Sequence, residues 1–380
     1  MNNKHPSIER ACHIVNDPYG FIASADRNEK RYLGYDCVFV PVEIIHAAGF
    51  TPVRLFGKPK GMGTDQRIPS QCCDFLKGLI QTVNEGELSF LEGAVFGFCC
   101  DTLKAGSSIL ESSGQLSIYT MGIPTKFRGK PAKTLLVKEI EIFKRFMENR
   151  FDFVISSDRI KKSIEQYRKQ NRLLQKLKSL KTENPDILSG HDVLNLLSAG
   201  YFIPVEDHIL ILEELVESVS GRVGSERETA VRGNKKILLS GLVNCNYGLV
   251  KKIENLGVSV VEDDLCEGSR SLFNPKTGPV SSGTEWAEMI ADRILSLYCP
   301  VKIETKSEYA DVLIEKYKNG DADGIVFIFF KFCDPHYLEY TIARQKLMEK
   351  NIPFLVLESS LDGDNWGQIE TRIEAFIENI

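Results

Sequence analysis

The sequence predicts an α/β protein with two parallel-sheet lobes, and two similar phrases in the chain carry this prediction. Residues 324–330 form an apolar run of the length expected for a strand buried on both faces, too short to cross a membrane. A Cys-Asp-Pro sequence at 333–335 follows and suits the start of a helix, with Asp334 as the N-cap. The same pattern occurs at 93–98, where Cys99-Cys100-Asp101 follows a short apolar strand.

Both phrases lead through a helix-like stretch to an Ile-Pro pair, at 123–124 and at 352–353. Each half therefore has the pattern strand, Cys-Asp, helix, Ile-Pro and next strand. We interpret this as a weak internal duplication of a Rossmann-like (flavodoxin-like) lobe. Ligands of open α/β sheets bind at the carboxyl ends of the strands. If the two halves face each other, Cys100 and Cys333 meet in the cleft between them.

The remaining patterns divide the chain into three parts. Strands are expected at 34–42 and 50–56, and a long polar helix begins at Ser157. A glycine-bearing linker at 220–236 precedes another buried strand, at 237–241. We predict an N-terminal α/β lobe (1–132), a helical segment with a linker (133–235) and a C-terminal α/β lobe (236–380).

Composition excludes several classes of protein. A chain of 380 residues is long enough for two hydrophobic cores. The net charge of −5 and the lack of a basic stripe with aromatic residues argue against nucleic-acid binding. No apolar run approaches membrane-spanning length, and the N-terminal residues lack the apolar core of a signal peptide. We therefore expect a cytoplasmic protein.

The ten cysteines are unusual for such a chain. Cytosolic thiols stay reduced, so metal or redox use competes with simple burial as the explanation. Cys73 is expected at the head of a helix, whereas Cys100 and Cys333 follow buried strands. Three thiolates with an open fourth position fit an iron–sulfur cluster. A three-thiolate zinc site and no metal at all remain as alternatives, although the absence of CxxC pairs disfavours zinc.

Other catalytic motifs are absent from the sequence. There is no strand-linked GxGxxG, no P-loop and no GxSxG elbow. Glu43 and His46 lie three residues apart on a predicted helix and share one face. They are candidates for an acid–base pair. A capping glutamate and a packed histidine explain the same spacing equally well.

Several phrases, taken in order, resemble the 2-hydroxyacyl-CoA dehydratase D-component family, which includes the related benzoyl-CoA reductase subunits. The resemblance extends from about Gly34 to the C-terminus. Each phrase alone is weak, but their combination and order are specific. The phrases are PVEIIHAAGFTPVRLFG, CDFLKGLI, CCDTLK, ADGIVFIFFKFCDP, IPFLVLE and GQIETRIEAFIE.

The resemblance implies two α/β lobes around one 4Fe-4S cluster held by three cysteines. By position these are Cys73, Cys100 and Cys333, with Cys72 and Cys99 as alternates within the doubled pairs. It also implies a lyase that removes water from a 2-hydroxyacyl-CoA through a ketyl radical. An ATP-dependent iron–sulfur activator would supply the electron, and a related second subunit would complete a heterodimer or a homodimer. Glu43, on the family's P-x-E-[IL] phrase, is expected to touch substrate or a proton.

Three alternatives stay open within the resemblance. One is an ATP-activated reductase of an aromatic acyl-CoA or another poorly reducible substrate. A second is a larger double-cubane cluster that also uses Cys245, Cys266 or Cys299. A third is an electron-relay subunit that holds a cluster but binds no substrate.

Overall fold

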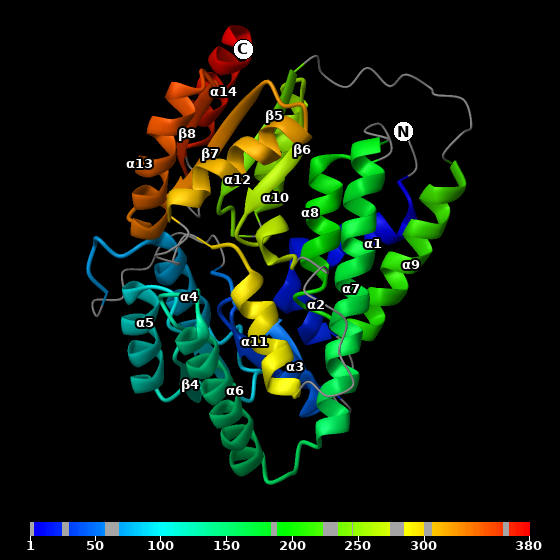
Figure 1. Cartoon of the computed structure of the whole chain (residues 1–380), viewed down its shortest axis with the longest axis vertical. Coiled ribbons are helices and arrows are strands. Elements are labelled where there is room, and N and C mark those ends of the chain that lie inside the picture. Colours follow the sequence, from blue (N-terminus) through cyan, green and yellow to red (C-terminus); the bar gives the residue numbers. More distant parts are fainter. Residues whose placement is uncertain are drawn as a thin grey trace.

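Two four-stranded parallel sheets organise the fold, one in each half of the chain (Figure 1). The strands of the first sheet are β1 (Arg31–Tyr35), β2 (Phe50–Arg54), β3 (Ala94–Gly97) and β4 (Ile118–Met121). Those of the second are β5 (Lys235–Gly241), β6 (Val258–Leu265), β7 (Gly324–Phe330) and β8 (Phe354–Ser359). The computed structural model describes residues 4–24, 30–57, 68–183, 188–222, 235–244, 246–273, 285–299, 306–359 and 365–380.

The two sheets share one topology. Their strand orders are β2-β1-β3-β4 and β6-β5-β7-β8, so the first strand in sequence lies second in each sheet. This order is the flavodoxin-like one, in which the direction of strand progression reverses between the first and third strands. The predicted α/β class with two related parallel-sheet lobes is confirmed. The three-part division of the chain at 132 and 235 stays a prediction.

Helices cover the sheets and connect the lobes. In the first half they are α1 (Pro6–Asn16), α2 (Pro18–Ser24), α3 (Val42–Ala47), α4 (Asp74–Asn84), α5 (Asp101–Ser112), α6 (Lys130–Phe151) and α7 (Ser157–Glu183). In the second half they are α8 (Gly190–Ala199), α9 (Val205–Arg222), α10 (Tyr247–Asn255), the 3₁₀ turn η1 (Ser269–Ser271), α11 (Trp286–Ser296), α12 (Lys306–Asn319), α13 (Asp334–Glu349) and α14 (Trp366–Asn379). No helix among the described residues is long and apolar enough to cross a membrane.

The first strand differs from the sequence prediction. It was expected at 34–42 but spans Arg31–Tyr35, where it pairs residue by residue with β2. The apolar stretch behind it turns instead of extending, because Pro41 cannot donate a ladder hydrogen bond and leads directly into α3. Strand β6 continues to Leu265, so Cys266 directly follows it. Most of the predicted linker, residues 223–234, and Cys245 lie outside the described residues.

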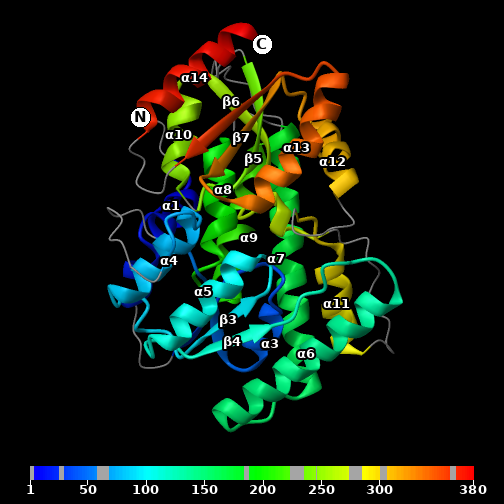
Figure 2. The same ribbon diagram turned by 90° about the vertical axis from the view of Figure 1, so that its left-hand side faces the viewer.

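The lobes are tied together by elements that cross between them. Helix α7 packs on α3 of the first lobe, and its Lys181 Nζ donates to the Val260 carbonyl of β6 over 2.6 Å. Figure 2 shows the two sheets one above the other, with α11 lying low beside α6. Ile290 and Ile294 of α11 share a buried cluster with Ile140 of α6. A helix from the second half of the sequence thus completes the first lobe.

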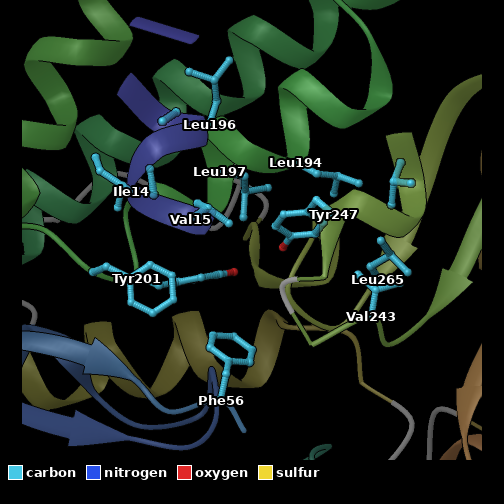
Figure 3. Close-up of a cluster of buried hydrophobic side chains, with 14 of the residues drawn as sticks. Ile14, Val15, Phe56, Leu194, Leu196, Leu197, Tyr201, Val243, Tyr247 and Leu265 are labelled. Atoms are coloured by element: carbon cyan, nitrogen blue, oxygen red, sulfur yellow. The ribbon is translucent and has the colours of Figure 1, made fainter. Parts of the chain in front are cut away.

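A single core also runs between the lobes. Figure 3 shows Phe56, which follows β2, below Tyr201, with Val15 of α1 above both. Val243 and Tyr247 belong to the same cluster, although they follow β5 in the other lobe. Since packed apolar surface is the main stabilising term in folding, the relative position of the lobes is fixed by this shared core.

Gly241 shows how tightly the second sheet is closed at its carboxyl edge. Its φ is +123°, and an added Cβ would lie 2.0 Å from the Ile328 carbonyl oxygen of β7. We expect Gly241→Ala to lower the free energy of unfolding by about 3 kcal/mol, because overpacking and left-handed strain add. Gly367→Ala is the matched control, since a Cβ there meets nothing within 4 Å. Chemical denaturation of both variants tests this, and equal small effects would contradict it.

Candidate functional site

Three cysteines occupy the N-cap positions of three different helices. Cys73 caps α4, Cys100 caps α5 and Cys333 caps α13, and none makes a side-chain capping hydrogen bond. Asp334, the predicted N-cap, is instead the first residue of α13. Free N–H groups and the positive end of the helix dipole favour anions at such positions. All three sulfur atoms are therefore placed to act as thiolate ligands.

The three cysteines affect one another's ionisation across the two lobes. Burial raises the pKa of each thiol, to about 12 for Cys100. Negative charge on Cys73 raises the pKa of Cys100 further, and both raise that of Cys333. Because such charge effects fall off with distance, the three sulfur atoms lie in the same region of the structure. The structure thus brings together the three residues that the sequence singled out.

The spacing of these sulfur atoms does not suit a single small ion. Zinc binds thiolates at ≈ 2.3 Å, so its ligand atoms lie about 4 Å apart. Among the described residues, one group of potential ligand atoms lies within 4.8 Å of one another: Cys12, His191 and Asp192. There Asp192 is already bound to Lys4 at 2.5 Å and completes a capping box with Ser189. Cys73, Cys100 and Cys333 do not form such a close group, so a single zinc ion bound by all three does not fit the structure.

A second sulfur pair adjoins this site at the edge of the first sheet. Cys37 follows β1, and Cys99 follows β3. A hydrogen bond between the two side chains lowers the pKa of Cys37. Between these strands, the Gly97 amide donates to Asp36 Oδ1 over 2.9 Å. Asp36 Oδ2 is buried and has no hydrogen-bond partner among the described residues. Burial raises the pKa of Asp36 well above its usual value, and the neighbouring Cys37 adds to the effect.

Arg54 brings a positive charge to the same region. The residue is 2% exposed, and its Nη2 donates to Cys266 Sγ over 3.4 Å. Its guanidinium also lies 4.8 Å from the ring centre of Tyr201. Burial lowers the pKa of Arg54, but Tyr201 and Cys266 outweigh that effect and the net shift is upward. A permanently charged cation thus faces the cysteine site, and Cys266 in turn raises the pKa of Cys333.

Cys333 is backed by a chain of buried polar groups. Its sulfur lies 3.1 Å from His336 Nδ1, and His336 Nε2 lies 3.1 Å from Arg270 Nη1. Arg270 in turn donates to Asp264 from Nε over 3.0 Å and from Nη2 over 2.6 Å. Burial lowers the pKa of His336 to about 3 and the nearby Arg270 charge adds to the effect.

Glu43 and His46 are not brought together. Glu43, 2% exposed, pairs with Arg293 of α11, whose Nε and Nη2 lie 2.5 and 2.9 Å from its two carboxylate oxygens. His46 points to the other side, where Nδ1 lies 2.9 Å from Ser163 Oγ and Nε2 lies 3.1 Å from a Glu206 oxygen. The two side chains thus have different partners in the structure, and a role as an acid–base pair stays a prediction.

A pocket lies beside the Glu43–Arg293 ion pair, between the first lobe and the crossing helices. Glu43 and Arg293 line it, whereas His46 does not. The other lining side chains mix aromatic and amide groups and include Tyr35, Tyr167, Gln170, Asn171, Tyr201 and Phe273. Apolar walls with a few fixed polar groups are typical of small-molecule sites.

Sequence reasoning missed several members of this neighbourhood. Cys37 was hidden because the strand was extended past it, although a cysteine directly after a strand is the signal used for Cys100. Cys266 was considered only as a member of a larger cluster, and its position directly after β6 was not predicted. His336 carried a weak signal, since it lies three residues past Cys333 in a helix start. Nothing in the sequence could have paired Arg54 with Cys266, or Arg270 with His336.

Comparison with known proteins gives a consistent result. The sequence profile of the family described as 2-hydroxyglutaryl-CoA dehydratase, D-component, matches residues 37–380. The lactoyl-CoA dehydratase β subunit of Anaerotignum propionicum is 24% identical over 358 residues, which are 92% of this chain and 91% of the relative. The (R)-phenyllactyl-CoA dehydratase β subunit of Clostridium sporogenes is 23% identical over the whole of both chains. A benzoyl-CoA reductase subunit of Thauera aromatica is 24% identical over 97% of both.

The raised pKa of Cys100 has a measurable consequence in metal-free protein. With its pKa near 12 rather than the ordinary value of 9.0, the thiolate fraction at pH 8 falls about a thousandfold. We expect iodoacetamide to label Cys100 about a thousandfold more slowly in the folded apoprotein than in denaturant. The rate should rise tenfold per pH unit up to about pH 12 for as long as the fold survives. Mass spectrometry of the Cys100 peptide measures the labelling rate, and rapid labelling at pH 8 would contradict the burial of this thiol.

Proposed function

Since the chain belongs to the 2-hydroxyglutaryl-CoA dehydratase, D-component family, we propose that it is an iron–sulfur subunit of a 2-hydroxyacyl-CoA dehydratase type enzyme. Such an enzyme is a lyase that eliminates water from a 2-hydroxyacyl thioester. The observation that carries the proposal is the convergence of three helix-capping cysteines from both lobes on one buried site.

The residues of the site fit a 4Fe-4S cluster. Cys73, Cys100 and Cys333 would hold it, leaving one iron without a cysteine. Among the alternates, Cys99 is engaged with Cys37, and Cys72 is not an N-cap, which favours Cys73 and Cys100. When bound, the cluster supplies one-electron chemistry and a Lewis-acidic iron for the substrate oxygen.

The side chains around the cysteines have complementary roles in this proposal. Arg54 contacts Cys266 and lowers the pKa of Cys37, so its charge favours thiolates beside the cluster site. Asp36, whose buried Oδ2 has no partner within the described residues, is available to hydrogen-bond a group bound nearby. Glu43, fixed by Arg293 at the pocket, contacts substrate as a binding group. His46 has a structural role in this proposal: its contacts with Ser163 and Glu206 hold α3 in place.

The proposal includes partners. Each of the relatives is named as one subunit of a larger enzyme, two of them as β subunits, which implies a companion for this chain as well. We propose that this companion is a related chain and that a separate ATP-dependent iron–sulfur activator delivers the electron. The substrate class is an acyl-CoA, with the acyl part in the aromatic-lined pocket beside Glu43.

A second candidate function is favoured by the additional sulfur atoms. Cys37 raises the pKa of Cys100, Cys266 raises that of Cys333, and Cys99 is hydrogen-bonded to Cys37. Two sets of three thiolates would suit a larger, double-cubane cluster and an ATP-activated reductase. Cys37→Ser and Cys266→Ser distinguish the two: iron content unchanged by either variant favours 4Fe-4S, whereas loss of half the iron or more favours the larger cluster.

Activity of cysteine variants tests the leading proposal. Purified without oxygen and supplied with its companion chain, activator and ATP, the wild-type chain should dehydrate a 2-hydroxyacyl-CoA. Cys73→Ser, Cys100→Ser and Cys333→Ser should each lower the rate at least a hundredfold, because each removes one ligand from the cluster. Cys12→Ser is the control, since Cys12 lies on α1 apart from this site, and should keep the wild-type rate. Full activity in Cys333→Ser, or reduction of acyl-CoA without dehydration, would end the proposal.

A further inference from the structure

The polar chain behind Cys333 fixes the protonation of one histidine ring by geometry alone. Arg270 has only donor atoms, so its Nη1 at 3.1 Å from His336 Nε2 requires that nitrogen to accept. An imidazolium ring, which donates from both nitrogens, does not fit this contact. The single proton of the neutral ring therefore sits on Nδ1, 3.1 Å from Cys333 Sγ. His336 Nδ1–H donates to the sulfur.

The guanidinium group of Arg270 is itself held in place by several neighbours. Asp264, with no exposed surface, accepts two of its hydrogen bonds, and Lys316 Nζ lies 3.0 Å from the other oxygen of that carboxylate. Tyr309 OH lies 3.1 Å from Arg270 Nη2. The His336 ring also stacks on Phe329, with centroids 5.6 Å apart and planes 13° apart. The ring is therefore held in a fixed orientation, and its N–H is preorganised toward the sulfur.

We infer that Asp264, Arg270 and His336 are positioning residues that raise the reduction potential of the group held by Cys333. This inference rests on the proposed function and deepens it. A hydrogen bond to a ligand sulfur stabilises the more negative, reduced state, and such bonds are among the factors that set iron–sulfur potentials. Among the described residues, Cys73 and Cys100 have no histidine contact of this kind. The cluster environment is thus asymmetric, with the second lobe supplying the donor.

His336→Phe tests the inference because it removes the donor while keeping a ring to stack on Phe329. In a redox titration followed by electron paramagnetic resonance, we expect the reduced-to-oxidised ratio at a fixed potential to fall about tenfold, a shift of ~59 mV for one electron. His336→Asn returns an amide N–H near the Nδ1 position and should restore a value near that of the wild type. An unchanged potential in His336→Phe with full iron content would overturn the inference.

His208→Phe is the matched control for losing a buried histidine. His208 has no exposed surface and bonds the Leu196 carbonyl from Nε2 over 2.7 Å, away from the cysteine site. The reduction potential of this variant should equal that of the wild type. An equal shift in both variants would show a general effect of destabilisation and would overturn the specific role of His336.

A second measurement separates this inference from the proposed function. Nitrogen-15 NMR of the metal-free wild-type chain, with labelled histidine, should show the His336 proton on Nδ1; the chain has six histidines, and His336→Asn assigns the signal. A proton on Nε2 would contradict the hydrogen-bond chain whether or not iron binds. If the wild-type chain takes up no iron, the proposed function fails and the tuning role fails with it, even where the Nδ1 proton is found.

Discussion

The reversal of strand order in each parallel sheet is the constraint on which the site depends. Parallel strands direct all their carboxyl ends to one edge, and the reversal between the first and third strands leaves a crevice at that edge. Cys37 and Cys100 follow the two strands on either side of the crevice in the first lobe, and Cys333 follows the corresponding β7 in the second. Because the lobes share one core, their relative position is fixed, and cysteines of both lobes influence one another's pKa.

The electrostatics of this site disfavour free thiolates, but they are compatible with thiolates that bind a metal group. Burial keeps the capping thiols protonated, as the raised pKa values of Cys73, Cys100 and Cys333 show. A metal ligated by cysteine must displace these protons, so its binding free energy has to exceed the cost of ionising them in a buried place. Helix N-termini at all three cysteines and the His336 contact at Cys333 reduce that cost.

Local patterns in the sequence were sufficient to predict the strands and helices that carry the cysteines of the site. A fully apolar run followed by Cys-Asp-Pro has few structural solutions, and it folds as strand β7 capped into α13 by Cys333. Strand ends that depend on pairing with a neighbouring strand were harder to predict. The apolar residues after Tyr35 resemble a strand in sequence, yet the pairing of β1 within the described residues ends at Tyr35. Contacts such as Arg54 with Cys266 join residues 212 positions apart, and no periodicity encodes them. The same holds for Glu43, whose partner Arg293 is 250 positions away.

The central claim is that cysteines of both lobes hold one iron–sulfur group, and the iron and acid-labile sulfide content of the chain tests it most directly. The protein should be purified without oxygen and its reduced form examined by electron paramagnetic resonance. The account predicts about four irons and four sulfides per chain, with about eight irons indicating the larger cluster. Zinc alone, or a chain free of metal under these conditions, would contradict it.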